Sequence, residues 1–373
     1  MKALKVMLLL ILFVFLPSCS NDKRIIHELH QYQTNLEYKT YEKESERFSF
    51  RSRIVPLHEP NLNRITSWYG NHEVLILVND GISSRLEKYN FYTGKRDVFY
   101  KSSDFIMQVQ PNSNNTYVAI ESKDISNNSI LAILNAEGDM VLQKKIAVDF
   151  LELAWSPYAP SSLMVTSYYP SLQTTIEVMD LEQQEKQELH IEPYVQWFSK
   201  DQVAYFDWNN GASLQAPIKI YNIHSTTTQH LSQNAILFDS IPNYFMYMEF
   251  KEDVLNVKFV DSTTQNEVNS FDTPVLDSHA GYIWSPIFDW SSTSNLFFIF
   301  EAKQAGSLID YNHGYQLIVY DVQAGKKQDV VSVDEITNLD CSPNGEWCLM
   351  GAQLENLVDI NTGEIMKLVN EKS

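Results

Sequence analysis

The chain has 373 residues, of which 44% are apolar and 12% aromatic, and it carries a net charge of −19 at neutral pH. This composition is that of a globular protein with a sizeable core, long enough for one large all-β domain or two ordinary domains. The strongly negative charge argues against binding to nucleic acid, or to an anionic lipid surface over the body of the protein.

Residues 1–18 have the pattern of a secretion signal peptide. Lys2 and Lys5 give it a basic start, and residues 6–16 form an unbroken apolar run that is too short for a comfortable membrane span. The run ends in Leu16-Pro17-Ser18-Cys19, which resembles the lipobox of bacterial lipoproteins, although the proline departs from the small residue usual there. The resemblance implies that Cys19 is acylated, palmitate included, and that its lipid chains hold the protein at the extracytoplasmic face of the cell membrane. The alternative is an ordinary signal peptide with an incidental cysteine.

Residues 19–47 are rich in Lys, Glu, Asn, Gln and Thr and show no sustained periodicity. This indicates a tether between the lipid and a folded domain. We expect residues 48–373 to form that domain. At its start, residues 48–55 alternate between apolar and polar side chains, and they are a candidate for a strand that pairs with the end of the chain.

Two short patterns recur along residues 48–373. In the first, a large residue precedes Ser, Pro or another turn former, and a strand-like run follows the turn; proline ends a strand because it has no N–H to donate. The first pattern occurs at Trp68-Tyr69-Gly70, Val109-Gln110-Pro111, Trp155-Ser156-Pro157, Trp197-Phe198-Ser199, Ser240-Ile241-Pro242, Trp290-Ser291-Ser292 and Cys341-Ser342-Pro343.

In the second pattern, an apolar residue precedes an Asp or Asn that can accept hydrogen bonds from the backbone of a turn, and Gly often follows to supply a positive φ. The second pattern occurs at Tyr89-Asn90, Leu134-Asn135, Met179-Asp180, Tyr221-Asn222, Val260-Asp261, Tyr320-Asp321 and Val358-Asp359. We expect it to mark the hairpin between the third and fourth strands of a four-stranded unit.

Each pattern recurs at spacings of roughly 38 to 60 residues, close to the length of one propeller blade. The predicted fold class is therefore all-β: a β-propeller of seven four-stranded blades, preceded by the signal peptide and the tether. A six-bladed ring with one irregular unit is the alternative. The surplus length of the later units falls at residues 276–288 and 302–315, which we expect to be long surface loops.

The units that contain Trp-Ser-Pro or Ser-Pro-Asn-Gly resemble the WD40-like repeats of TolB-type and peptidase-associated propellers. The chain as a whole, with its lipobox, short tether and propeller, is similar to the YqgU-like propeller lipoproteins of Firmicutes. This resemblance implies an architecture and a location, and no reaction mechanism.

Two further cysteines, Cys341 and Cys348, flank a short turn on what should be adjacent antiparallel strands. Directly opposed residues of such strands come within disulfide range, and an extracytoplasmic location permits the bond. Two buried thiols that fill apolar positions are the alternative, and both readings stay open from the sequence.

The sequence contains no nucleophile elbow, zinc-protease helix, phosphate-binding loop or dinucleotide fingerprint. We therefore predict no catalytic residue, no metal site and no cofactor. Aromatic residues gather instead in expected loops, where they are candidates for a ligand-binding surface, because Trp and Tyr combine a large apolar area with a polar tip. The candidates are Tyr168, Tyr169, Trp208, Asn209, Tyr282 and Trp284. Packing of these aromatic rings under their own loops is the alternative.

Taken together, these features favour a monomeric, membrane-anchored propeller that serves as a binding or scaffold module for a protein or a cell-envelope ligand. One alternative is a propeller-type hydrolase or lyase that acts on cell-wall glycan or peptide, because a fold alone does not set function. A second alternative is a sensor or accessory lipoprotein of an envelope process.

Overall fold

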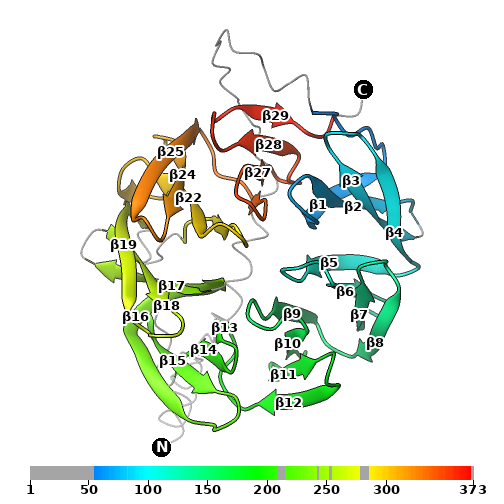
Figure 1. Cartoon of the computed structure of the whole chain (residues 1–373), viewed down its shortest axis with the longest axis horizontal. Helices are drawn as coiled ribbons and strands as arrows, with labels where there is room; N and C mark the ends of the chain where they lie inside the picture. The colour runs from blue at the N-terminus through cyan, green and yellow to red at the C-terminus, as the bar shows by residue number, and fades with distance from the viewer. Residues whose placement is uncertain are drawn as a thin grey trace, which may run out of the picture. The chain divides into compact units, whose positions relative to one another are not determined.

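The computed structural model describes residues 54–370, except residues 82, 209–214, 242, 252–253 and 278–284. The described residues form β-strands that succeed one another around a ring (Figure 1). The predicted signal peptide, the tether and Cys19 lie outside the described residues. The all-β propeller predicted from the repeats is confirmed.

Five sheets each contain four antiparallel strands, and we call each of these sheets a blade. They are blade 1, β1 (Leu62–Trp68), β2 (Glu73–Asn79), β3 (Ser84–Asn90) and β4 (Arg96–Ser102); blade 2, β5 (Phe105–Pro111), β6 (Tyr117–Lys123), β7 (Ser129–Asn135) and β8 (Met140–Ile146); blade 3, β9 (Phe150–Trp155), β10 (Ser162–Tyr168), β11 (Thr174–Asp180) and β12 (Glu185–Leu189); blade 6, β21 (Phe288–Trp290), β22 (Leu296–Ala302), β24 (Tyr315–Asp321) and β25 (Lys326–Val333); and blade 7, β26 (Leu339–Cys341), β27 (Trp347–Met350), β28 (Asn356–Asp359) and β29 (Ile365–Lys367).

Between blades 3 and 6 the strands form one continuous seven-stranded sheet. Its strands are β13 (Val195–Ser199), β14 (Gln202–Phe206), β15 (Ala216–Asn222), β16 (Thr228–Ile241), β17 (Tyr244–Lys251), β18 (Val254–Asp261) and β19 (Glu267–Pro274). The 14-residue strand β16 pairs with β15 through its first half and with β17 through its second half. It is thus the last strand of blade 4 and the first strand of blade 5. If the seven-stranded sheet is divided at β16, the described strands make seven four-stranded blades. If it is counted as one sheet, the ring contains six large sheets.

In blades 1 to 4 the first strand lies toward the centre of the ring and the last strand lies at the rim (Figure 1), and the strands of the other blades follow one another in the same order. Because successive strands are antiparallel, the loops of a blade alternate between two faces of the ring. We call the face with the loops after first and third strands the turn face; in blade 2 these loops are residues 112–116 and 136–139. The face with the loops after second and fourth strands is the loop face; in blade 2 these loops are residues 124–128 and 147–149.

The second sequence pattern does what was predicted of it. Its Asp or Asn is the last residue of the third strand in every blade, and its side chain accepts hydrogen bonds from the N–H groups of the following turn. In blade 1, for example, Asn90 Oδ1 accepts from the N–H groups of Tyr92 and Thr93, each at 3.1 Å. The corresponding acceptors are Asn135, Asp180, Asn222, Asp261, Asp321 and Asp359.

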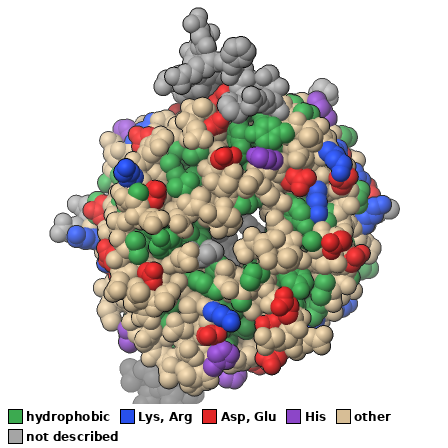
Figure 2. Space-filling model, in the orientation of Figure 1, with side chains coloured by type: hydrophobic (Ala, Val, Ile, Leu, Met, Phe, Trp, Pro, Cys, Tyr) green, Lys and Arg blue, Asp and Glu red, His purple; other side chains and the backbone are tan. Residues whose placement is uncertain are grey.

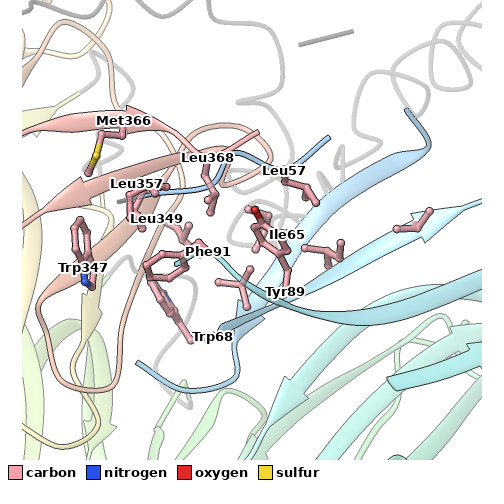
Figure 3. Packing of buried hydrophobic residues seen from close by; sticks show 14 residues of the cluster. Leu57, Ile65, Trp68, Tyr89, Phe91, Trp347, Leu349, Leu357, Met366 and Leu368 are labelled. Atoms are coloured by element: carbon pink, nitrogen blue, oxygen red, sulfur yellow. The ribbon is translucent and has the colours of Figure 1, made fainter. Parts of the chain in front are cut away.

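The hydrophobic core is divided among the seams between blades. Each of seven buried clusters in the described residues draws its side chains from two adjacent blades. The cluster between blades 7 and 1 is shown in Figure 3, where Trp347 and Leu349 of blade 7 face Trp68 and Phe91 of blade 1. The blades are therefore held by their contact with neighbours, as expected for sheets that pack face to face.

The tryptophans of the first pattern also connect neighbouring blades by hydrogen bonds. The indole N–H of Trp155 donates to Gln110 O at 2.8 Å, and that of Trp197 donates to Ala154 O at 2.9 Å. In both cases the acceptor lies on the innermost strand of the preceding blade. Trp68 makes the same bond to Asp340 O at 2.9 Å, which joins blade 1 to blade 7.

The ring is closed beside that bond, at a position slightly beyond the candidate strand of residues 48–55. The N–H of Leu57 donates to Leu368 O at 2.7 Å, and the N–H of Asn370 donates to Leu57 O at 3.1 Å. Leu57 and Val369 form an isolated parallel bridge. Residues 48–53 lie outside the described part, so the observed closure is this bridge.

The two surplus segments of the later units meet each other. A short strand in each, β20 (Leu276–Asp277) and β23 (Gly306–Ser307), pairs with the other in parallel. Both short strands belong to the loop face, since β20 follows the last strand of blade 5 and β23 follows the second strand of blade 6. The expected surface loops thus contain a small two-stranded sheet of their own.

Candidate functional site

Tyr168 stands on the loop face at the end of β10, beside the innermost strand of blade 3. Its hydroxyl donates to Glu152 Oε2 at 2.8 Å, and its ring stacks on Phe150 with a centroid distance of 4.2 Å. Burial, and secondarily the Glu152 carboxylate, raise the pKa of the Tyr168 hydroxyl. The tyrosine therefore stays neutral and acts as a hydrogen-bond donor held in a fixed orientation.

The other predicted aromatic residues that the structure describes are partly buried. Tyr169 packs against the core between blades 2 and 3, and its N–H donates to Gln173 O at 2.9 Å in a turn. Trp208 lies against Phe206, with ring centroids 5.0 Å apart. Both residues follow the second strand of their blade, so they share the loop face with Tyr168. Asn209, Tyr282 and Trp284 lie outside the described residues.

Two exposed apolar side chains at the loop-face end of an innermost strand were not recognised from the sequence. Phe105 and Met107 belong to β5, the innermost strand of blade 2, and they are 53% and 42% exposed. Beside them, the guanidinium of Arg64 on β1 donates to Met107 O. We call Arg64, Phe105, Met107, Phe150 and Tyr168 the mouth residues, because they come from innermost strands or from the strand end next to one, on the loop face of blades 1 to 3.

Three aspartates line the innermost strands on the opposite side of the ring, in blades 5, 6 and 7. Asp239 accepts from the N–H of Ser240 at 2.8 Å and from the indole N–H of Trp290 in the next blade at 3.3 Å. Asp289 accepts from the backbone N–H of Cys341, again in the next blade. For the carboxyl of Asp340, no hydrogen-bond donor is found within the described ranges.

Burial raises the pKa of all three carboxyls. The pKa of Asp239 rises to about 6 and that of Asp289 to about 7, in each case mainly because surrounding protein disfavours the charged form. The pKa of Asp340 rises well above its usual range through burial and through the neighbouring charge of Asp289. The arrangement can hold protons near neutral pH, and its members repel one another when ionised.

A repeated signal in the sequence marks these aspartates. Each follows a large apolar residue and directly precedes the residues of the first pattern, as Phe238-Asp239, Phe288-Asp289 and Leu339-Asp340. The same position in other blades holds Ser67, Gln108, Ala154 and Gln196. Its polar or small character was visible from sequence, but the approach of the three carboxyls to one another was not.

The described ranges contain no group of three His, Cys, Asp or Glu side chains that could hold a metal ion. Figure 2 shows an opening at the centre of the ring, and acidic side chains spread around the face in view without forming one patch. On the turn face, an open groove of about 690 Å³ lies over blades 2 and 3. Its lining includes Asn114, Tyr117, Glu137, Tyr158, Asp180 and Lys200.

In the structure, Cys341 and Cys348 are joined by a disulfide, with their Cα atoms 4.0 Å apart. They are directly opposed residues of β26 and β27. Both are almost fully buried, at 5% and 0% exposure, in the core between blades 6 and 7. The bond thus ties the innermost strand of blade 7 to the second strand of the same blade.

Comparison with known proteins places this fold in a family. The profile of the YqgU-like 6-bladed beta propeller domain matches residues 90–351. The lipoprotein YqgU of Bacillus subtilis (strain 168) is 25% identical over 322 residues, which cover 85% of this chain and 87% of that protein.

Two solved structures show the same fold. The crystal structure of the protein lmo1340 of Listeria monocytogenes EGD-e has a TM-score of 0.77 at 17% identity and covers 85% of this chain and 97% of its own. The β-propeller domain of the Trilobed protease from Pyrococcus furiosus has a TM-score of 0.54 at 11% identity, with coverage of 83% and 97%. Within the described residues, no helix has the length and apolar character needed to cross a bilayer.

Proposed function

This chain belongs to the YqgU-like β-propeller domain family, and from that premise we propose that it is a lipid-anchored module whose propeller binds a protein or a cell-envelope ligand outside the membrane. Three features support the proposal: the lipobox-like Leu16-Pro17-Ser18-Cys19, the similarity to a lipoprotein of Bacillus subtilis, and the mouth residues of the loop face.

The anchor rests on Cys19. A diacylglycerol on its thiol adds two acyl chains, and two chains give stable membrane attachment where one chain gives only reversible binding. Residues 19–47 then serve as the tether, and the domain that starts near residue 48 stands away from the bilayer. Such an arrangement suits a protein that must meet partners or wall material close to the membrane.

The binding surface rests on one observation. Phe105 and Met107 expose about half of their apolar side chains on an innermost strand, and Phe150 and Tyr168 continue the aromatic surface on the next blade. Large apolar side chains on a loop-bearing face offer binding area at little conformational cost. Trp208, which follows the second strand of blade 4, lies on the same face and can add contacts.

The test is crosslinking in living cells of the full-length lipidated protein that carries a photo-reactive side chain at Met107 or Trp208. We expect a reproducible adduct with one partner, identified by mass spectrometry. The control carries the same group at Glu182 on the turn face, where that adduct should be missing. Equal capture at both positions, or none at the loop face, would contradict the proposal.

The anchor has a separate test. Replacing Cys19 by Ala should move the protein from the membrane fraction to the soluble or secreted fraction, as followed by immunoblotting of fractionated cells. A Cys19→Ala protein that still sediments with membranes would show that the lipid anchor is wrong, whatever the propeller binds.

A hydrolase or lyase that acts on cell-wall glycan or peptide is the second candidate, and one observation favours it. Asp289 and Asp340 are neighbouring carboxyls with raised pKa values, as a general acid requires. Incubation of the protein with purified wall fragments, followed by mass spectrometry of the products, distinguishes the two functions. Turnover that is lost in Asp340→Asn would favour the enzyme, and an unchanged fragment would favour the binding module.

A further inference from the structure

We propose that the mouth residues recognise a carboxylate joined to an apolar group, as at the C-terminal residue of a peptide, with Arg64 as its counter-ion and Phe105 and Met107 as its apolar contacts. This inference rests on the proposed binding function and adds the chemical class of the ligand.

Arg64 is a half-buried cation on β1. Its guanidinium donates a hydrogen bond to the backbone carbonyl of Met107 on β5. In the described part of the chain it forms no ion pair. The other two arginines on the strands of blade 1 differ, because Arg96 pairs with both Glu59 and Glu87, and Arg85 pairs with the same two carboxylates.

A charge that is partly removed from water is stabilised by a partner of opposite sign. Arginine does not escape by losing its proton, since its pKa remains far above neutral even when burial lowers it. The remaining N–H donors of Arg64 are therefore available to an acceptor that comes from outside the described residues. A planar carboxylate fits such a donor fork through two parallel hydrogen bonds.

The surroundings of Arg64 indicate what is attached to that carboxylate. Met107, whose carbonyl binds the guanidinium, exposes its own side chain, and Phe105 does so two residues earlier on the same innermost strand. Exposed apolar side chains next to a half-buried cation favour a ligand that presents an apolar group beside its negative charge.

Charge on the protein argues for a singly charged ligand. The chain carries a net charge of −19. Glu152 on blade 3 adds a carboxylate beside Tyr168, one of the mouth residues. A doubly charged phosphate would meet more repulsion from this field than one carboxylate does. A C-terminal peptide carboxylate combines a single charge with an apolar neighbour, and it is the occupant that these features fit.

The experiment compares two probes against the full chain in non-ionic detergent: N-acetyl-alanyl-leucine with a free carboxylate, and the same dipeptide as its C-terminal amide. We expect isothermal titration calorimetry to show that the acid binds at least about tenfold more tightly than the amide, as one charged hydrogen-bonded pair supplies. Arg64→Met should bring the acid to the affinity of the amide, whereas Phe105→Ala should weaken both probes and keep the preference.

Two further variants serve as controls for the effect of Arg64→Met. Lys95→Met removes the same charge from an exposed turn on the other face and should leave the preference intact. Arg64→Lys is the substitute if Arg64→Met proves unstable. It keeps the positive charge but loses the paired N–H donors of the guanidinium, so it should retain part of the preference for the acid.

Equal affinity for acid and amide, or a preference that survives Arg64→Met, would overturn the inference, and Arg64 would then be a structural strap between blades 1 and 2. Inorganic phosphate that displaces the acid at equal concentration would also overturn it, because the site would then recognise charge alone. Neither result touches the proposed binding function, which is tested separately by crosslinking and fails if the loop face captures no partner or captures it no better than Glu182 does.

Discussion

At the scale of single residues, the side chain that precedes the first pattern bonds to the next blade in blades 2, 5 and 6. Gln108 donates to Leu151 O at 2.6 Å, Asp239 accepts from Trp290, and Asp289 accepts from the N–H of Cys341. Asp340 holds the same position in blade 7, but its carboxyl finds no hydrogen-bond donor among residues 54–370 as far as these are described. A carboxyl without donors and beside Asp289 is more stable in its protonated form.

This arrangement gives the folded protein a distinctive dependence on pH. Because the pKa values of Asp239, Asp289 and Asp340 are raised on folding, the folded state binds more protons than the unfolded state above about pH 4. The stabilisation they supply is present below that pH and is lost as pH rises through about 6 and about 7 for Asp239 and Asp289.

We therefore predict that Asp340→Asn, which cannot ionise, raises the free energy of unfolding at about pH 8 by on the order of 1 kcal/mol. The gain should shrink toward about pH 5, where the native carboxyl is already protonated. Urea denaturation followed by tryptophan fluorescence across this range measures the effect. The exposed change Asp272→Asn is the control, and an Asp340→Asn profile parallel to the native one would contradict the prediction.

At the scale of elements, the turn between the third and fourth strands carries two constraints at one glycine. Gly138 has a φ of 92°, and a Cβ added to it would lie 2.2 Å from Phe99 O on the last strand of the preceding blade. Gly363 stands in the same relation to Val330 O, at 2.3 Å. The turn thus needs glycine both for its own conformation and for its approach to the neighbouring blade.

We predict that Gly138→Ala destabilises the protein by on the order of 2 kcal/mol, because both strain and a backbone clash oppose the new methyl group. Gly306→Ala is the matched control, since nothing lies within 4 Å of a Cβ built there; its effect should stay within about 0.5 kcal/mol. Thermal unfolding of the two variants side by side makes the comparison. Similar melting temperatures would show that the contact between blades 1 and 2 adjusts to the added methyl group without loss of stability.

The hairpin of β26 and β27 is stabilised by a disulfide bond. The bond between Cys341 and Cys348 spans a sequence separation of 7 residues, so it constrains only a short loop of the unfolded chain. We predict that replacing both cysteines by alanine lowers the free energy of unfolding by about 2 kcal/mol.

Two measurements check the disulfide. Mass spectrometry of non-reduced peptides should find Cys341 linked to Cys348, and reductant should lower the stability of the native protein while leaving the double variant unchanged. Free thiols that accept an alkylating reagent at both positions would show that the protein does not carry the bond in cells.

At the scale of the whole molecule, the ring depends on one seam that joins distant parts of the chain. Leu57, Leu368 and Asn370 exchange backbone hydrogen bonds, and the Trp68 indole bonds to Asp340 O across a sequence separation of 272 residues. The cluster in Figure 3 fills the same seam with apolar side chains, among them Leu368, which is fully buried. Every other seam joins blades that are adjacent in sequence.

We predict that a chain ending at Lys367 loses about 2 kcal/mol from the burial of Leu368 alone. Hydrogen exchange followed by mass spectrometry should then show faster exchange in β1 and in β26 to β28, with blades 3 and 4 unaffected. A chain ending at Asn370 keeps the closing bonds and is the control. Uniformly faster exchange around the ring would mean that the blades unfold as one cooperative body.

Much of the candidate site was beyond sequence reasoning. The position of Tyr168 at a strand end was predictable, but its bond to Glu152 joins two strands whose contact only the folded blade creates. Arg64 and Met107 are 43 residues apart and meet across a seam. A charged residue in one strand and an apolar residue in another give no sign in the sequence that the two are in contact.

The hairpins could be predicted from the sequence, because their causes are local. Proline at the end of a first strand, and Asp or Asn at the end of each third strand, act on backbone groups only a few residues away, so their repetition revealed an all-β propeller. The packing of the blades, by contrast, sets three other features: β16 serves two blades, Leu57 closes the ring, and three carboxyls line inner strands together with Arg64, which has no ion pair within the described ranges. These features depend on contacts between blades, and contacts over such separations arise when packed sheets exclude water, which no local pattern records.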